Sequence, residues 1–209
     1  LFERILYMKL PLFTTFVIFC VLVSYIAKKN TVNAEEITHE FFERERKANS
    51  IRRQPIDHLP YIHVPVESLP LDKLDDINAR EFCRVIKELE HKQILNLTGI
   101  SNTDLKLQYG AANLSTLTEC DQNYTVLVRN IAFLAEIYMN NGLRKEAITL
   151  LEYGISIGTD VKKNYDLLGA VYAENKEYDK IQTLITTAET VNSLSKDAIL
   201  NHLKELSES

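Results

Sequence analysis

Leu134-Ala135-Glu136-Ile137-Tyr138 returns as Leu168-Gly169-Ala170-Val171-Tyr172, and this repeated stretch decides the fold. The offset is 34 residues, and the same offset relates Leu151 to Ile185 and Gly154 to Ala188. Around both copies the apolar residues recur at intervals of three and four, the spacing of one face of an α-helix. A repeat of this length predicts an all-α array of helical hairpins.

The repeated residues resemble those of the tetratricopeptide repeat family. The positions that carry the resemblance are Leu134, Ala135, Tyr138, Gly142, Ala147 and Leu151 in the first copy and Leu168, Gly169, Tyr172, Ile185 and Ala188 in the second. The resemblance implies a short α-solenoid. It also implies that Ala135 or Gly169 lets the second helix of its hairpin approach closely, and that Tyr138 or Tyr172 fills the gap between successive hairpins.

The resemblance covers residues 128–191 and departs from the family pattern at four positions. Ile131 and Tyr165 stand where the family has a tryptophan, Thr159 where it has a closing proline, and Ile181 where it has a small residue. Two repeats are fewer than the three that such arrays usually need. We therefore expect residues 76–120 to form an atypical helical unit in front of the repeats at 121–209.

Local signals predict where the helices begin and end. Asp76 to Leu95 indicates one helix, and Ser101 is placed to cap a second that runs towards Thr118. Gly142 and the pair Asn175-Lys176 suit the turns inside the two hairpins. Gly158 ends the first hairpin, Thr159-Asp160 caps the next helix, and Ser195 opens a terminal capping helix that reaches Leu206.

Four prolines recur at an interval of five before the helical region, at Pro55, Pro60, Pro65 and Pro70. Each proline removes a backbone donor and disfavours helix in the residue before it, so residues 55–75 are predicted to form a stiff, extended strap. The strap also carries apolar residues between its prolines. Two interpretations follow: it fills a groove on the helical region, which we favour, or it is itself a ligand for a partner.

The N-terminal region predicts a membrane anchor. Residues 10–27 contain no charge and give about 27 Å of helix, close to the thickness of a bilayer's apolar core. A flank at residues 1–9 precedes this segment. Basic residues are more numerous after it, which favours a single-pass protein of the cell membrane with its C-terminal region in the cytoplasm. The alternative is a cleaved signal, which would leave a secreted binding protein that starts at Glu35.

Residues 28–54 are dense in charge and are predicted to form a stalk. They suit a short coiled coil, a basic face on anionic lipid, or a solvated charged helix, and we favour the last. The whole organisation also resembles membrane-anchored repeat proteins of Gram-positive bacteria, a resemblance that brings no activity with it.

Composition and motifs favour a binding role over catalysis. The net charge of −5 provides no basic field for nucleic acid. The sequence contains no phosphate-binding glycine loop, no HExxH and no nucleophile elbow. We therefore expect no enzyme activity, no cofactor, no metal, no small-molecule substrate and no nucleic acid partner.

The favoured function is a scaffold that holds a peptide or protein partner near a membrane. In the resembled family the first helix of each unit lines the concave face. The corresponding residues here are Arg129, Asn130, Phe133, Glu136 and Ile137 in the first unit and Lys163, Asn164, Asp166, Leu167 and Val171 in the second. The alternative is a structural subunit that assembles with itself through the anchor and the stalk.

Overall fold

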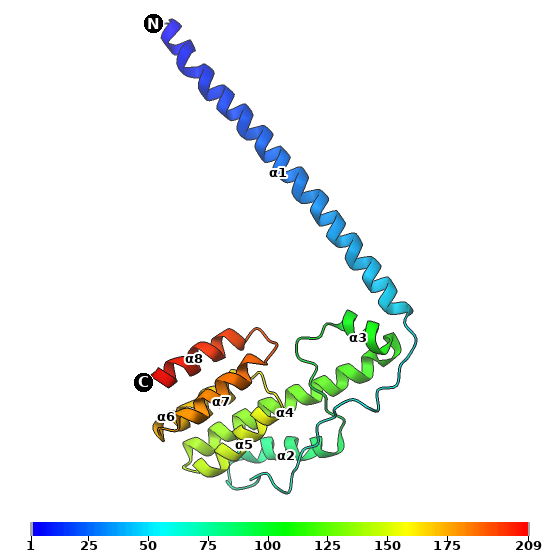
Figure 1. Cartoon of the computed structure of the whole chain (residues 1–209), viewed down its shortest axis with the longest axis vertical. Coiled ribbons are helices and arrows are strands. Elements are labelled where there is room, and N and C mark those ends of the chain that lie inside the picture. The colour runs from blue at the N-terminus through cyan, green and yellow to red at the C-terminus, as the bar shows by residue number, and fades with distance from the viewer. Residues whose placement is uncertain (1, 209) are drawn as a thin grey trace. The chain divides into compact units, whose positions relative to one another are not determined.

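The computed structural model describes the backbone of residues 2–208 and the side chains of residues 14–25 and 37–208. The chain forms two compact units, residues 1–51 and residues 52–209; the second is called the helical unit from here on. Within the described residues every element of regular secondary structure is a helix (Figure 1), which confirms the all-α class.

The first unit is one helix, α1 (Phe2–Ser50), which holds the predicted membrane segment and most of the predicted stalk. Residues 14–25 carry no charge, and all of them are exposed on this helix. Over the residues whose side chains are described, no helix is long and apolar enough to cross a membrane. The predicted flank at 1–9, residues 10–13 and 26–27 of the predicted anchor and residues 28–36 of the predicted stalk lie outside those residues.

The stalk helix is shorter than predicted, because it ends at Ser50 and not at residue 54. The next residues are held by the helical unit. The Gln54 amide donates to the Tyr109 carbonyl at 3.0 Å, and the Arg53 guanidinium donates to the Asn113 side chain at 2.9 Å. These bonds fix the backbone after Arg52 in a non-helical conformation.

The helical unit is a stack of paired helices (Figure 1). Its helices are α2 (Ile77–Glu88), α3 (Asn102–Tyr109), α4 (Leu114–Asn140), α5 (Arg144–Ser156), α6 (Lys162–Glu174), α7 (Tyr178–Glu189) and α8 (Lys196–Glu208), with 3-10 turns η1 (Leu89–His91) and η2 (Ala111–Asn113). Short turns join α4 to α5 and α6 to α7, so each pair is an antiparallel hairpin, and α5 packs against α6. α2 packs against α4, and α8 packs against α6 and α7.

Two helices in front of the repeats differ from their predicted bounds. α2 is capped as predicted, because the Asp76 carboxylate accepts a hydrogen bond from the Ala79 amide at 2.9 Å, but it ends at Glu88 and not at Leu95. The predicted second helix towards Thr118 is broken at Gly110, whose φ of 85° and ψ of 147° are not helical. The chain turns there, so α4 begins four residues later and extends the first repeat helix towards the N-terminus.

The turns that leave the repeat helices follow the sequence signals, with one difference. Gly142, Gly158 and Lys176 all have positive φ, and Gly158 ends the first hairpin as predicted. The helix cap predicted at Thr159-Asp160 does not form. α6 begins at Lys162, and no side chain caps its first turn. The Thr159 hydroxyl instead accepts a hydrogen bond from the Val161 amide at 3.1 Å and stabilises the loop before the helix.

The residues that define the repeat lie in the core. Leu134, Ala135, Tyr138, Ala147, Leu151, Leu168, Gly169, Tyr172, Ile185 and Ala188 are all buried, while Gly142 is exposed in its turn. The expected reason for Gly169 is wrong. A side chain there would meet Leu203 and Leu206 of α8, so the glycine admits the terminal helix and not the second helix of its own hairpin.

The two repeated tyrosines each contact the structure that precedes their hairpin. The Tyr172 hydroxyl donates to the Glu152 carboxylate of α5 at 2.8 Å. The Tyr138 hydroxyl accepts a hydrogen bond from the Lys73 amide at 3.1 Å and lies 4.0 Å from the Cys83 sulfur of α2. Residues 55–75 and α2 therefore occupy, for the first hairpin, the place that α5 occupies for the second.

The proline segment, residues 55–75, packs on the helical unit and is not uniformly extended. The amides of Tyr61, Val66 and Leu71 donate to the carbonyls of Leu59, Val64 and Leu69 at 2.8–2.9 Å. Each of these bonds spans one proline, which makes the segment a series of tight three-residue turns centred on Pro60, Pro65 and Pro70. The interval of five in the sequence is therefore a repeated turn and not the straight strap that we predicted.

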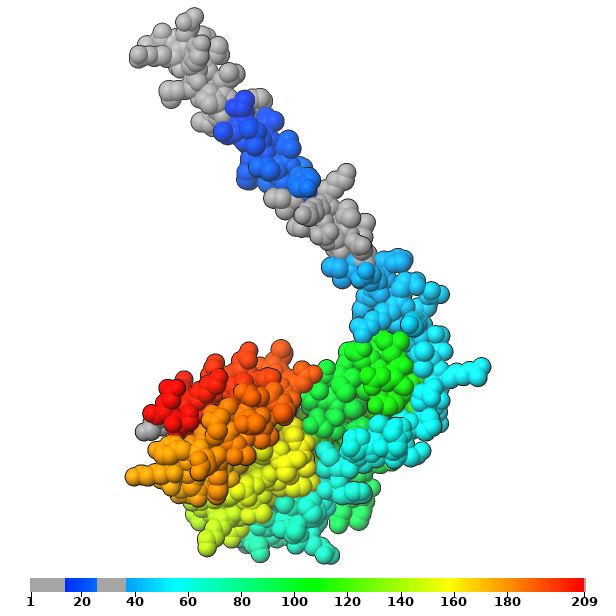
Figure 2. Space-filling view, in the orientation of Figure 1, coloured from blue at the N-terminus to red at the C-terminus, as the bar shows by residue number. Residues whose placement is uncertain are grey.

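These turns direct the apolar residues beside the prolines inwards. Val64, Leu69 and Leu71 are buried in the main core with the residues of α2, α4 and α5. The Ile62 amide donates to the Ile94 carbonyl at 2.9 Å, and the Tyr153 hydroxyl of α5 donates to the His63 carbonyl at 3.1 Å. Of the two interpretations of this segment, the first therefore holds: its apolar side chains fill the surface of the helical unit. Figure 2 shows the segment in cyan on that surface.

Asn164 and Gly154 are buried next to each other, and we expect the effect of Gly154→Ala to depend on the side chain at position 164. Asn164 is 0% exposed, and among the described residues both polar atoms of its side chain are without a hydrogen-bond partner. A methyl group on Gly154 would overlap its side-chain nitrogen. We expect Gly154→Ala to destabilise the chain by about 1–3 kcal/mol, the range for overpacking a closed site.

The sign should reverse when Asn164 is shortened. In an Asn164→Ala background the overlap is gone, and Gly154→Ala should stabilise α5 by about 0.5–1 kcal/mol, since alanine is the better helix former. Urea unfolding of the wild type, both single variants and the double variant measures the coupling. Equal effects of Gly154→Ala in both backgrounds would show that the two side chains do not compete for space.

Candidate binding cleft

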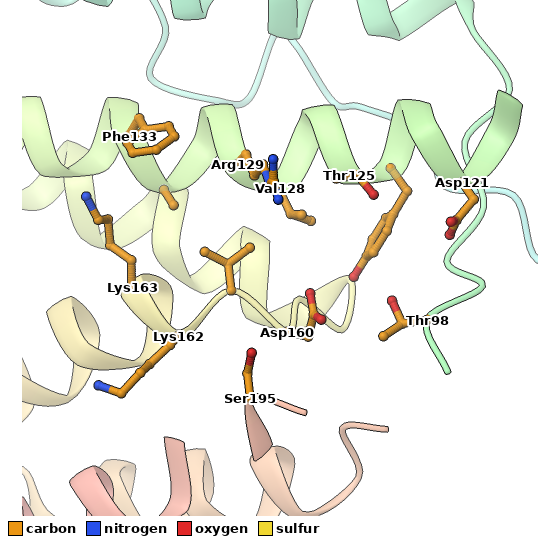
Figure 3. A pocket seen from close by; sticks show the side chains of 13 residues that line it. Thr98, Asp121, Thr125, Val128, Arg129, Phe133, Asp160, Lys162, Lys163 and Ser195 are labelled. Atoms are coloured by element: carbon orange, nitrogen blue, oxygen red, sulfur yellow. The ribbon is translucent and has the colours of Figure 1, made fainter. Parts of the chain in front are cut away.

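A cleft of about 510 Å³ lies on the side of the helical unit formed by α4 and the start of α6. Its lining residues are Thr98, Asp121, Tyr124, Thr125, Val128, Arg129, Ala132, Phe133, Asp160, Val161, Lys162, Lys163 and Ser195. Figure 3 shows the α4 side chains on one side and Asp160 and Ser195, from the loops before α6 and α8, on the other. The cleft thus joins both hairpins and the terminal helix.

One of the lining residues, Phe133, belongs to an aromatic stack. The rings of Phe133 on α4 and Phe82 on α2 are stacked with centroids 5.7 Å apart. The Lys163 ammonium lies 4.7 Å from the centroid of the Phe133 ring and is paired with the Glu136 carboxylate at 2.5 Å. Phe133 is still 42% exposed, so its ring offers an apolar surface to the cleft.

The loop that carries Asp160 is fastened by buried hydrogen bonds. The Tyr124 hydroxyl of α4 donates to the Gly158 carbonyl at 2.7 Å, and the Asn96 side chain donates to the same carbonyl at 3.1 Å. The Tyr165 hydroxyl of α6 donates to the Thr159 carbonyl at 2.9 Å. α4, α6 and the loop at Asn96 therefore hold the backbone at Gly158 and Thr159, the two residues before Asp160.

The charged groups of the cleft fall into two classes. Lys162 is paired with Asp166 at 2.6 Å, Lys163 is paired with Glu136, and the Asp121 carboxylate accepts the Leu97 amide at 3.1 Å. Arg129 and Asp160 differ, because neither side chain has a hydrogen bond or ion pair to any residue that the structure describes. The protein thus uses three of these charges internally and leaves one cation and one anion available.

Burial keeps the two tyrosines beneath the cleft neutral, so that their hydroxyls stay donors. It raises the pKa of Tyr124 far above the ordinary value and the pKa of Tyr165 to about 12, and Asp160 adds to both shifts. An unfolded tyrosine has a pKa of about 10. Above about pH 10 the unfolded chain therefore loses a proton that the folded chain retains at Tyr165.

Stability should consequently be complete below about pH 10 and decline as the pH rises towards 12. The expected slope is up to about 1.4 kcal/mol per pH unit for Tyr165 alone. Urea unfolding at successive pH values measures it, with Tyr165→Phe as the variant that should show a shallower decline. An unchanged slope in that variant would contradict the assignment of this tyrosine.

The predicted partner-binding residues are only partly brought together. Arg129, Phe133 and Lys163 line the cleft, and Glu136 and Asp166 stand beside it as partners of its lysines. Asn130 binds the Val126 carbonyl within its own helix at 2.7 Å. Ile137 and Leu167 are half-buried against the core.

Two of the predicted surface residues are buried, which corrects the prediction. Asn164 is 0% exposed and Val171 is 1% exposed. The prediction placed the first helix of each unit on the concave face, as the resembled family does. α5 and α8 both pack against α6, and the additional contacts cover two positions that a single helical hairpin would leave open.

Sequence reasoning missed Asp121, Tyr124, Thr125, Asp160 and Ser195. A usable signal was present for Asp121 and Thr125. They precede Arg129 and Phe133 at intervals of four, so all four lie on one face of a continuous helix. Asp160 and Ser195 lie in loops, whose placement depends on the packing of the helices that they connect.

The chain was also compared with known proteins. No family model, no curated protein and no solved structure matches it.

Proposed function

We propose that this protein is a membrane-anchored binding module whose cleft holds a peptide segment of a protein partner. The observation that carries the proposal is the composition of the cleft. An exposed aromatic ring, several hydroxyl groups and two uncompensated charges converge on one concave surface that is built by both hairpins. Such a mixture of apolar area and a few directed polar groups is typical of sites that recognise ligands.

The rigidity of the cleft supports the same proposal. Binding costs less when the groups that contact the ligand are already held in place. The α4 wall is a continuous helix, and the opposite wall is the loop fastened by Tyr124, Tyr165 and Asn96. The partner would therefore meet a preformed surface.

Anchoring to a membrane is supported by the composition of α1. Residues 14–25 are apolar or hydroxylated on every side of the helix, and a helix that is apolar all round normally has an apolar environment. Alkaline carbonate extraction of membranes from cells that express the full chain tests this part. Release of the intact protein into the soluble fraction would contradict it.

Site-specific photocrosslinking tests the binding role. A photoreactive phenylalanine at Thr125, which is exposed and lines the cleft, should give discrete adducts with a partner in cells that express the full chain. The matched control is the same group at Thr149, an exposed threonine on α5 that takes no part in the cleft. Mass spectrometry should place the adduct at one defined segment of the partner.

A second variant shows whether the cleft itself is occupied. Ser195→Trp places a large ring at the mouth of the cleft from the loop before α8, and should abolish the Thr125 adduct without changing the helix content. Identical adducts from both crosslinking positions, or an adduct that survives Ser195→Trp, would exclude the cleft as the binding site.

A further inference from the structure

Two charged side chains of the cleft, of opposite sign, have no hydrogen bond or ion pair to any residue that the structure describes, and this makes the chemistry of the ligand specific. Arg129 is exposed on α4, and Asp160 lies on the facing loop (Figure 3). The other charged groups that line the cleft have internal partners: Asp166 for Lys162, Glu136 for Lys163 and the Leu97 amide for Asp121. Internal partners therefore satisfy three of the five charged groups that line the cleft, and Arg129 and Asp160 leave a positive charge on one wall and a negative charge on the other.

We infer that the cleft selects a segment of mixed charge, with an acidic side chain for Arg129 and a basic side chain for Asp160. This inference rests on the proposed function. A guanidinium matches a carboxylate with two parallel hydrogen bonds, which makes the Arg129 contact directional. A purely acidic segment would bring negative charge close to Asp160 and Asp121, and a purely basic one would meet Arg129 and both lysines.

The two charges are also positioned to fix the direction of the bound chain. Arg129 is on a helix and Asp160 is on a loop held by hydrogen bonds, so the positive and the negative charge keep fixed positions on opposite walls of the cleft. A segment with its acidic residue before its basic residue is not equivalent to one in the reverse order. One order should therefore bind better than the other at any given spacing.

Binding of synthetic peptides to the full chain in detergent tests this inference. The probes are fluorescein-labelled peptides that carry Glu and Lys in both orders at several spacings, with matched peptides that carry two Glu, two Lys, or Gln in place of either charge. The best mixed peptide should bind about five- to ten-fold more tightly than its Gln variants, because each lost ion pair in a partly enclosed site is worth roughly a factor of this size.

Reversing the charge at position 129 or 160 should change which peptide binds best, a result that misfolding would not produce. Arg129→Glu should shift the preference to peptides with two Lys, and Asp160→Lys should shift it to peptides with two Glu. The double variant Arg129→Glu/Asp160→Lys should prefer the reverse order of the best wild-type peptide. Lys145→Glu, an equal change of charge on an exposed residue of α5, should leave the ranking unchanged.

Three results would overturn the inference: equal binding of doubly acidic and mixed peptides to the wild type, a ranking that the two single variants do not alter, or no binding by any peptide of the set. In each case a cleft-specific adduct at Thr125 would still support a binding role. The loss of that adduct, and not the peptide ranking, is what would remove the proposed function.

Discussion

Gly110→Ala is expected to lower the free energy of unfolding of the helical unit by about 3–5 kcal/mol. The φ of 85° and ψ of 147° at Gly110 lie in a region that is nearly restricted to glycine, and occupying it with alanine costs about 1–3 kcal/mol. A methyl group there would also lie 2.5 Å from the Arg52 carbonyl oxygen and 2.9 Å from the Arg53 Cα. Because both are backbone atoms, relief requires the chain to move, which adds overpacking strain of similar size.

The matched control is Gly142→Ala. Gly142 has a φ of 77°, close to that of Gly110, but a methyl group on it meets no atom within 4 Å. It should therefore show the conformational penalty alone, about 1 kcal/mol. Urea unfolding of the full chain, followed by circular dichroism, compares the two. Similar losses for both variants would show that residues 52 and 53 do not pass over Gly110.

Tyr138→Ala should be as damaging, with an expected loss of about 3–5 kcal/mol, the range for removing a buried aromatic side chain. Tyr138 is 0% exposed and contacts three parts of the helical unit. Its ring belongs to the main core, and its hydroxyl accepts the Lys73 amide and lies beside Cys83. The variant should therefore detach the proline segment and α2 from α4.

Tyr138→Phe separates the ring from its hydroxyl. It keeps the packing and leaves the Lys73 amide without its acceptor, so the expected loss is only about 0.5–1.5 kcal/mol. Limited proteolysis of residues 55–75 supplies a second measurement. Tyr138→Ala should expose that segment to cleavage and Tyr138→Phe should not. Equal protection in both variants would show that the tyrosine does not hold the segment in place.

The repeat could be predicted from the sequence because its spacing and its small and aromatic positions are local properties. Leu134 and Leu168 recur at the repeat offset of 34 residues, and both are buried. The capping of α2 by Asp76 and the turns at Gly142 and Gly158 also follow from local chemistry. Each of these features depends on the few residues around it.

The cleft could be predicted only in part. Arg129, Phe133 and Lys163 belong to repeated helices, so the pattern indicated their face. The positions of Asp160 and Ser195 depend on how α6 and α8 pack against their neighbours. Asn164 shows the opposite error, because it was predicted on the surface and is enclosed where α5 packs against α6, next to Gly154.

The sequence by itself determined the helical class, the repeat period and the interval of five between the prolines. The tertiary structure decided that the prolines form tight turns and that the apolar residues beside them pack in front of Tyr138, in the place that α5 occupies for the second hairpin. It also decided that Gly169 makes room for α8. The tertiary structure decided, too, which two charges of the cleft have no partner within the part of the chain that the structure describes. Periodicity reports which residues share one face of one element, whereas burial and pairing depend on elements far apart in the chain, which meet only when the helices pack.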